Sequence, residues 1–236
     1  MWVVTEYEAT TLFTLKPASA TASGGKTLLV PTPFAIKMAL LDAACRLEGR
    51  RAGEAAWEWI RSLVVALRPS EEVVVNNTFI KILKPRRNPA EPGSLDAGYF
   101  NRTITYREYA HLVEPFGIAL EIGDHSDVEA LERWLVNINY LGKRGSFLQM
   151  VTPPQRTAEL DLDYIIINGD LEDSIDLNAL MTQLDDSSGN VTFEQVNIYS
   201  QKPLRLGKDR LLYNVTLPYE MVASSRGYTH YRRSES

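Results

Sequence analysis

Basic and aromatic side chains alternate through one stretch of the chain, between residues 79 and 107. Cations neutralise phosphate groups, and aromatic rings stack on unpaired bases. The combination predicts contact with a single-stranded nucleic acid; a solvated hairpin surface is the alternative. The basic residues are Lys81, Lys84, Arg86, Arg87, Arg102 and Arg107, set against Glu91 and Asp96, and the aromatic residues are Phe79, Tyr99, Phe100 and Tyr106.

A second basic element is the tetrapeptide Gly142-Lys143-Arg144-Gly145, which follows an expected helix. Glycine lets the backbone approach a phosphate closely, so that amide N–H groups and two cations can point at the anion. The alternative is that Lys143 and Arg144 complement the negative end of the helix dipole, which is worth about 0.3–1 kcal/mol. All four residues are candidate phosphate-binding residues.

Gly25-Lys26-Thr27 resembles the end of a phosphate-binding P-loop. The complete pattern requires a glycine at position 20, where this chain has Ala20, and a helix directly after the threonine. The segment that follows, Leu28-Leu29-Val30-Pro31, does not favour a helix. The sequence therefore argues against nucleoside-triphosphate binding and leaves Lys26 as a candidate for a single phosphate contact.

Tyr106, Tyr109 and His111 form a set that could carry out acid–base chemistry on RNA. Such groups can deprotonate a 2′-hydroxyl and protonate the leaving oxygen without a metal. The alternative is that these side chains have no catalytic role. The set therefore supports a metal-independent endoribonuclease as a second hypothesis.

Metal and cofactor chemistry find little support in the composition. The chain has one cysteine, Cys45, on the apolar side of an expected helix, and three scattered histidines, His111, His125 and His230. Zinc sites need closely spaced Cys and His ligands. We therefore expect no metal, no cofactor and a structural role for Cys45.

The formal net charge of −5 hides a strong asymmetry along the chain. Residues 1–156 hold 18 basic and 17 acidic residues; residues 157–200 hold ten acids and no lysine or arginine; residues 201–236 hold seven basic and three acidic residues. Salt screens charges beyond about 8–10 Å, so a polyanion responds to local patches. The net charge does not exclude nucleic-acid binding, and the acidic stretch is expected to face a protein partner or solvent.

The expected elements place these residues on an α+β framework. The N-terminal part reads as strand, helix, strand, insertion, strand, helix and strand, which is close to the order of ferredoxin-like (RRM-like) domains. The expected strands are 2–16, 73–84, 100–108, 116–122 and 146–151, the helices are 34–47, 54–67 and 128–139, and the proline- and glycine-rich segment 85–99 is a loop between strands.

The remaining residues predict a separate, β-rich extension. Pro153-Pro154 suggests a boundary between a domain at 1–152, with a hairpin insertion at about 84–105, and an extension at 153–236. Strands are expected at 164–168, 191–200 and 210–217, with a short helix at 177–184. The tail from residue 226 is expected to be poorly ordered.

The N-terminal residues lack a basic region followed by an apolar one, and no apolar run approaches the roughly 18–20 residues of a membrane span. We therefore expect a soluble, cytoplasmic protein with no membrane partner.

Three stretches, taken in order, resemble one family of RNA-binding proteins. Tyr140-Leu141-Gly142-Lys143-Arg144, after an amphipathic helix, is similar to the "YLGRR"-like turn of the CRISPR Cascade subunit that holds the 5′ handle of the guide RNA. This is the fifth Cas family, within the RAMP superfamily. Segments 31–41 and 103–116 are similar to that family's first-helix pattern and strand pair. The resemblance covers about residues 1–152.

The resemblance implies a non-catalytic subunit of a type I CRISPR Cascade effector. Its ferredoxin-like body would hold the 5′ handle of the crRNA, with Lys37 and the turn at 142–145 on the handle phosphates. The insertion at 84–105 would form a thumb beside the guide–target duplex. The implied partners are the crRNA, target DNA near the guide duplex, a Cascade backbone subunit and the large subunit.

Two alternatives stay open at this stage. One branch of the superfamily cuts precursor crRNA with Tyr, Lys and His side chains, which matches the endoribonuclease hypothesis. An α+β protein with an unrelated interaction role is the other, and it draws support from the net acidity and from residues 157–236. A structure without a basic groove would favour the second alternative.

Overall fold

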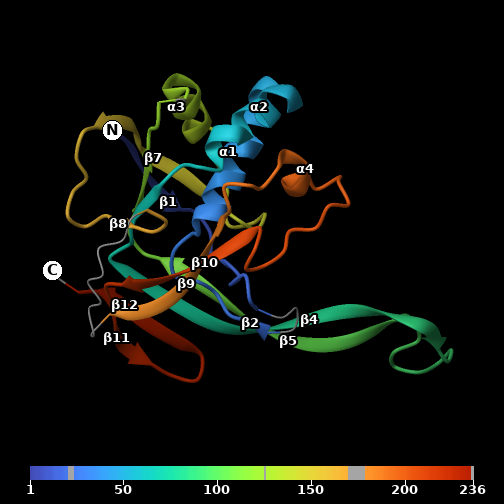
Figure 1. The fold of residues 1–236 in the computed structure, drawn as a ribbon. Helices are drawn as coiled ribbons and strands as arrows, with labels where there is room; N and C mark the ends of the chain where they lie inside the picture. The colour runs from blue at the N-terminus through green and yellow to red at the C-terminus, as the bar shows by residue number, and fades with distance from the viewer. Residues whose placement is uncertain (21–23, 125, 170–178, 235–236) are drawn as a thin grey trace.

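Alternating burial defines the first strand, β1 (Trp2–Ala9), in which Val3, Thr5 and Tyr7 are fully buried. In the computed structural model, which describes residues 1–20, 24–124, 126–169 and 179–234, β1 lies within a five-stranded antiparallel sheet. The strand order is β7-β1-β6-β3-β8 (Figure 1). The other strands are β3 (Val65–Arg68), β6 (Phe116–Glu121), β7 (Leu148–Thr157) and β8 (Ile165–Ile166).

Three helices gather on one side of this sheet (Figure 1): α1 (Pro33–Glu48), α2 (Arg50–Ile60) and α3 (Val128–Val136). The first begins where the sequence predicts it. Thr32 is its N-cap and accepts a hydrogen bond from the Ala35 amide at 3.1 Å, and Pro33 occupies the position where proline costs no hydrogen bond. The predicted helix 54–67 is wrong in its second half, because the chain leaves α2 after Ile60 and forms β3.

The second sheet carries a long hairpin that reaches away from the body (Figure 1). Its strand order is β11-β12-β4-β5-β2, and β4 (Glu72–Ala90) pairs with β5 (Gly98–Leu112) in antiparallel register. β2 (Gly24–Gly25) pairs with β5 in parallel. The predicted loop over 85–99 is therefore too long, because β4 continues to Ala90 and β5 begins at Gly98.

The C-terminal part adds strands to both the core and the second sheet. β9 (Leu180–Ser187) pairs with β10 (Arg210–Leu217), a short helix α4 (Phe193–Val196) lies between them, and β11 (Tyr219–Ser224) pairs with β12 (Tyr228–Arg233). The predicted strand 210–217 is confirmed. A strand at 191–200 is wrong because α4 occupies it, and the described part of the expected helix 177–184 is strand from Leu180 onward.

The expectation of a poorly ordered tail is wrong for residues 228–233, because β12 pairs with β4 from Tyr228↔Asn76 to Arg232↔Glu72. The chain is thus a mixed α/β protein built mainly on antiparallel sheets. β7 runs through Pro153 and Pro154, and Leu184, Val215 and Tyr219 share one hydrophobic core with Val3 and Leu40. The division at 152/153 stays a prediction.

Two further observations bear on the expectations from sequence. Among the described residues, no helix is long and apolar enough to cross a membrane, and no group of three or more His, Cys, Asp or Glu side chains is placed to hold a metal ion. Part of the acidic stretch, including Asp170, Glu172 and Asp173, and one of the three histidines, His125, lie outside the described residues.

Candidate functional site

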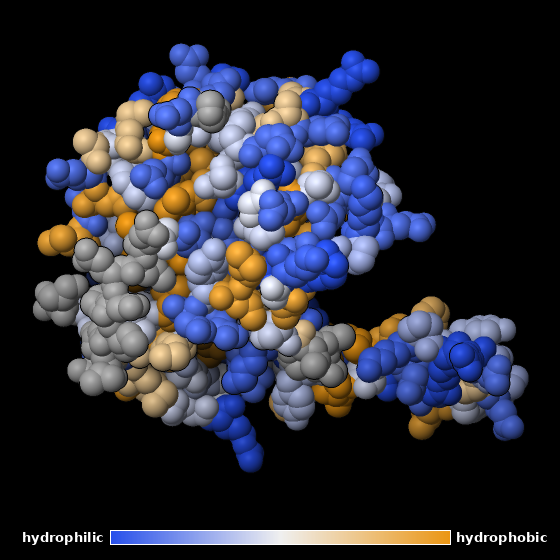
Figure 2. Space-filling model, in the orientation of Figure 1, coloured by the Kyte–Doolittle hydropathy of each residue, from blue (hydrophilic) through white to orange (hydrophobic). Residues whose placement is uncertain are grey.

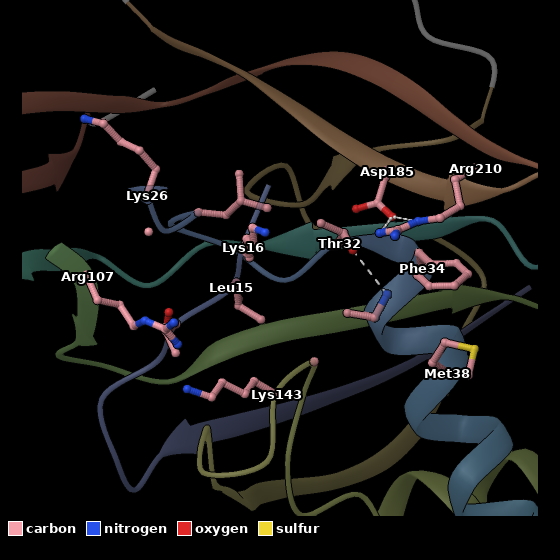
Figure 3. A pocket seen from close by; sticks show the side chains of 15 residues that line it. Leu15, Lys16, Lys26, Thr32, Phe34, Met38, Arg107, Lys143, Asp185 and Arg210 are labelled. Atoms are coloured by element: carbon pink, nitrogen blue, oxygen red, sulfur yellow. Dashed lines mark hydrogen bonds and ion pairs between the residues drawn. The ribbon is translucent and has the colours of Figure 1, made fainter. Parts of the chain in front are cut away.

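A cavity of about 490 Å³ opens between the N-terminus of α1, the edge of β5 and the turn after α3. We call it the basic pocket. Five cations and one carboxylate line it: Lys16, Lys26, Arg107, Lys143, Arg210 and Asp185. Figure 3 shows Lys26, Arg107 and Lys143 at one end, opposite Phe34, Met38 and Arg210. The excess of cations suits an anion, and the apolar end suits a flat ring.

Lys26 reaches the pocket because Glu108 fixes the segment that carries it. The Thr27 amide donates to a Glu108 carboxylate oxygen at 3.0 Å, and the Lys26 ammonium lies 3.2 Å from the other oxygen. The Lys26 side chain nevertheless stays 81% exposed. An exposed ion pair of this kind is worth little, so a phosphate can compete for the lysine.

Arg107 contributes a donor that the protein does not use. Its Nε is buried, and it has no hydrogen-bond acceptor among the described residues. A buried donor without a partner costs about 1–3 kcal/mol, and such a group is satisfied when a ligand supplies the acceptor. An anion in the basic pocket would do so.

The opposite end of the pocket is built from residues far apart in sequence. The Arg210 guanidinium lies 4.4 Å from the centroid of the Phe34 ring and forms an ion pair with Asp185, which is buried. Asp185 therefore neutralises the charge of Arg210, and it does not pair with the other four cations of the pocket. Sequence reasoning missed Lys16, Phe34, Asp185 and Arg210, because no local pattern indicates that β9 and β10 meet the start of α1.

The turn at 142–145 has the geometry that its glycines suggest. Gly142 and Gly145 have φ of 66° and 102°, and the Ser146 amide closes the turn on the Lys143 carbonyl at 3.1 Å. Lys143 lines the basic pocket, whereas Arg144 is exposed beside it. A Cβ on Gly142 would lie 2.9 Å from Leu15 Cδ2. This position therefore requires glycine for both conformation and space.

We expect Gly142→Ala to lower the free energy of unfolding by about 2 kcal/mol, because an L-residue in the left-handed region costs roughly 1–2 kcal/mol and the methyl group also crowds Leu15. Urea unfolding measures this loss. Gly145→Ala has the same backbone problem but meets no atom within 4 Å, so it should lose less. Gly123→Ala, with neither constraint, should lose least; equal losses at all three sites would contradict this account.

Lys37 does not lie where the sequence predicts. Its side chain is 1% exposed, and its ammonium donates to Asp186 Oδ2 at 2.7 Å and to the Arg61 carbonyl at 2.9 Å. The side chain of this lysine extends into the core, so its ammonium is not accessible to a phosphate at the surface. The prediction that Lys37 contacts handle RNA is therefore wrong in this structure.

Most of the predicted basic residues of the hairpin lie on its distal part, away from the basic pocket. Figure 2 shows this hairpin standing out from the body, with hydrophilic and hydrophobic side chains side by side. Phe79 pairs across the strands with Tyr106, and their ring centroids are 4.6 Å apart. The hairpin carries Lys81, Lys84, Arg86, Arg87, Arg102 and Tyr106, while Arg107 alone of the hairpin cations lines the pocket.

The three residues of the endoribonuclease hypothesis are not brought to one place. Successive side chains of a strand point to opposite faces, so Tyr106 projects from one face of β5 and Tyr109 and His111 project from the other. Tyr106 instead packs on Phe79. The acid–base set predicted from sequence therefore divides between two surfaces.

Comparisons with known proteins agree with the resemblance found in the sequence. No family model matches the chain. A curated relative, the CRISPR-associated protein Cas5 of Archaeoglobus fulgidus, is 28% identical over 191 residues, which covers 78% of each chain. This relative confirms the predicted resemblance to the fifth Cas family.

Two solved structures are also similar. A chain of a CRISPR RNA-guided surveillance complex has a TM-score of 0.51 at 13% identity, over 92% of this chain and 90% of that one. The crystal structure of a CRISPR protein from Archaeoglobus fulgidus has a TM-score of 0.42 at 12% identity, over 99% and 92%. The first of these likenesses shows a common fold.

Proposed function

We propose that this chain is a non-catalytic RNA-binding subunit of a type I CRISPR Cascade effector, and that the basic pocket holds the 5′ handle of the crRNA. The observation that carries the proposal is the pocket itself: five cations, one carboxylate that is already paired with Arg210, and an unused Arg107 donor converge on one cavity. Handle phosphates would meet Lys26, Arg107, Lys143 and the exposed Arg144 beside the pocket, and a base would lie against Phe34.

The order of elements supports a ferredoxin-like body for this function. β1, β3, β6 and β7, together with the helices between them, follow a β-α-β-β-α-β order. In the sheet they lie in the order β7-β1-β6-β3, so the fourth strand comes first and is followed by the first, third and second. The β4–β5 hairpin is inserted between the second and third of these strands. We assign it as the thumb that the family resemblance implies.

The thumb is proposed to lie beside the guide–target duplex and a Cascade backbone subunit, with the large subunit packed next to the body. Its composition supports this role, because Phe79, Leu83 and Ile104 are more than half exposed among its cations. Exposed apolar residues of this size usually mark a surface that another molecule covers. Target DNA would be contacted near the duplex.

A role without catalysis is supported by the separation of Tyr106 from Tyr109 and His111. General acid–base catalysis needs its groups within hydrogen-bond reach of the same reacting atoms. Two faces of one strand do not provide this arrangement. We therefore propose that precursor RNA is cut by another protein.

Salt titration tests phosphate binding by the basic pocket. We expect log Kobs for a handle RNA to fall linearly with log salt, with a slope of about −2 to −3, because single strands give roughly −0.7 for each phosphate contact. Fluorescence anisotropy with the full chain, alone and reconstituted with its partner subunits, measures the slope. An affinity that stays constant as salt rises would refute a phosphate-contact site.

A further inference from the structure

The second sheet has one buried face and one open face near the base of the hairpin. On β4 and β5, Val73, Val75, Ala110 and Leu112 are 0–7% exposed. The residues that alternate with them are not buried, and His111 is exposed. β12, formed by the C-terminal tail, extends this open face because it pairs with β4.

Register places ring side chains from three segments in two adjacent rows. Asn76 of β4 pairs with Tyr109 of β5 on one side and with Tyr228 of β12 on the other. Val74 likewise lies between His111 and His230. Residues directly opposite one another in a sheet project from the same face, so two tyrosines and two histidines share this surface. We call it the outer face.

Stackable rings, more than net charge, characterise the outer face, because exposed Glu220 of β11 stands opposite Arg232 of β12 on it. Glu72, the carboxylate of this face on β4, is already occupied: His230 Nε2 lies 3.0 Å and Arg232 Nε 2.9 Å from its two oxygens. Arg107 lies two residues before Tyr109 on β5, which places it on the same face, and it also lines the basic pocket. Rings, an amide and cations on an open sheet are the groups with which small RNA-binding domains stack two or three bases.

We propose that the outer face binds two or three unpaired nucleotides of a single strand, with bases stacked on Tyr109 and Tyr228 and the backbone near Arg107 and Arg232. This surface goes beyond the handle site proposed above. It would bind nucleotides whether or not the basic pocket holds the handle.

Ring removal in the full chain tests the proposal. With a fluorescein-labelled ten-nucleotide uridine RNA, we expect Tyr109→Ala and Tyr228→Ala each to weaken binding about tenfold, since stacking is worth about 1–3 kcal/mol per base. Tyr109→Phe and Tyr228→Phe keep the ring and should stay within about twofold. Tyr199→Ala removes a 91% exposed tyrosine elsewhere and is the matched control. Alanine variants that fold and bind like the wild type would overturn the proposal, as would phenylalanine variants that bind as poorly as alanine.

A second measurement keeps the test independent of folding and of the handle site. RNA and DNA strands carrying 4-thiouridine or 4-thiothymidine should cross-link to the wild-type chain within residues 105–112 or 226–233. These cross-links should persist when Lys143 and Arg144 are both changed to glutamate, a variant that affects the handle site alone. Absence of cross-links in both segments would overturn nucleotide binding by this face. Loss of a protein partner in the tyrosine variants would then identify the face as a protein-docking surface.

Discussion

Replacing Lys37 with alanine is expected to lower the free energy of unfolding by about 3–5 kcal/mol, because it leaves a buried carboxylate without its counter-charge. The Asp186 side chain is 3% exposed and lies 2.7 Å from the Lys37 ammonium. Its oxygens also accept hydrogen bonds from the Asn168 amide and the Ser187 backbone. These bonds hold the carboxylate in the core after the lysine is gone.

The ion pair joins segments that are distant in sequence. Lys37 lies on α1 and Asp186 lies on β9. The Arg61 carbonyl that Lys37 also contacts belongs to the residue at the C-terminal end of α2, and Asn168 follows β8. Burial raises the pKa of Asp186 and lowers that of Lys37, because burial disfavours both charged forms. A buried ion pair replaced as a whole by apolar residues therefore costs less than the loss of one partner.

Replacing both members of the pair tests whether an unpaired buried charge causes this loss of stability. K37M with D186L removes both charges and should recover much of the stability lost by Lys37→Ala, although the Asn168 amide, the Ser187 backbone amide and the Arg61 carbonyl each lose a partner. Arg46→Ala on the same helix breaks an exposed ion pair with Asp42 and an exposed hydrogen bond to the Asn137 carbonyl, and it should cost no more than about 1 kcal/mol. Urea unfolding of all three variants measures the order. A double variant less stable than Lys37→Ala would contradict the account.

Local chemistry explains what the sequence predicts well and what it misses. Thr32, Pro33 and the apolar stripe that follows define the start of α1 without outside help. The segment from Leu63 to Leu67 is apolar and fits a helix or a strand equally well, and it becomes β3 because Ala66 pairs with Ala119 of β6. That choice depends on a residue about fifty positions away, which periodicity does not detect.

The same distinction separates the parts of the basic pocket. Lys26 and Lys143 are predictable because adjacent glycines mark them as cations near an accessible backbone. Lys37 has the same charge but finds its partner at Asp186, and Arg210 finds Phe34, through contacts that only the folded chain brings together. The tail is misread for a related reason: its charged residues suggest disorder, but Arg232 and His230 pair with Glu72 across two strands.

Reversing both charges of the turn, Lys143→Glu with Arg144→Glu, is expected to weaken binding of a handle RNA about a thousandfold at low salt, since four unit charges change in all. Each reversal replaces an attraction to phosphate with a repulsion, at about 1 kcal/mol per unit charge for solvent-exposed groups at contact distance. The salt slope should also become shallower by about 1.4, because two phosphate contacts of a single strand are lost. Anisotropy titrations at several salt concentrations give both numbers.

Arg50→Glu with Arg51→Glu is the matched control, since it makes the same change in net charge at the exposed start of α2. Neither arginine lines the basic pocket. Salt screens exposed charges beyond about 8 Å at physiological ionic strength, so this pair should change the affinity by no more than about threefold there. Equal losses in the two double variants would mean that net charge alone attracts the RNA. A loss confined to the turn variant, which shrinks as salt rises, is the signature of phosphates held at Lys143 and Arg144.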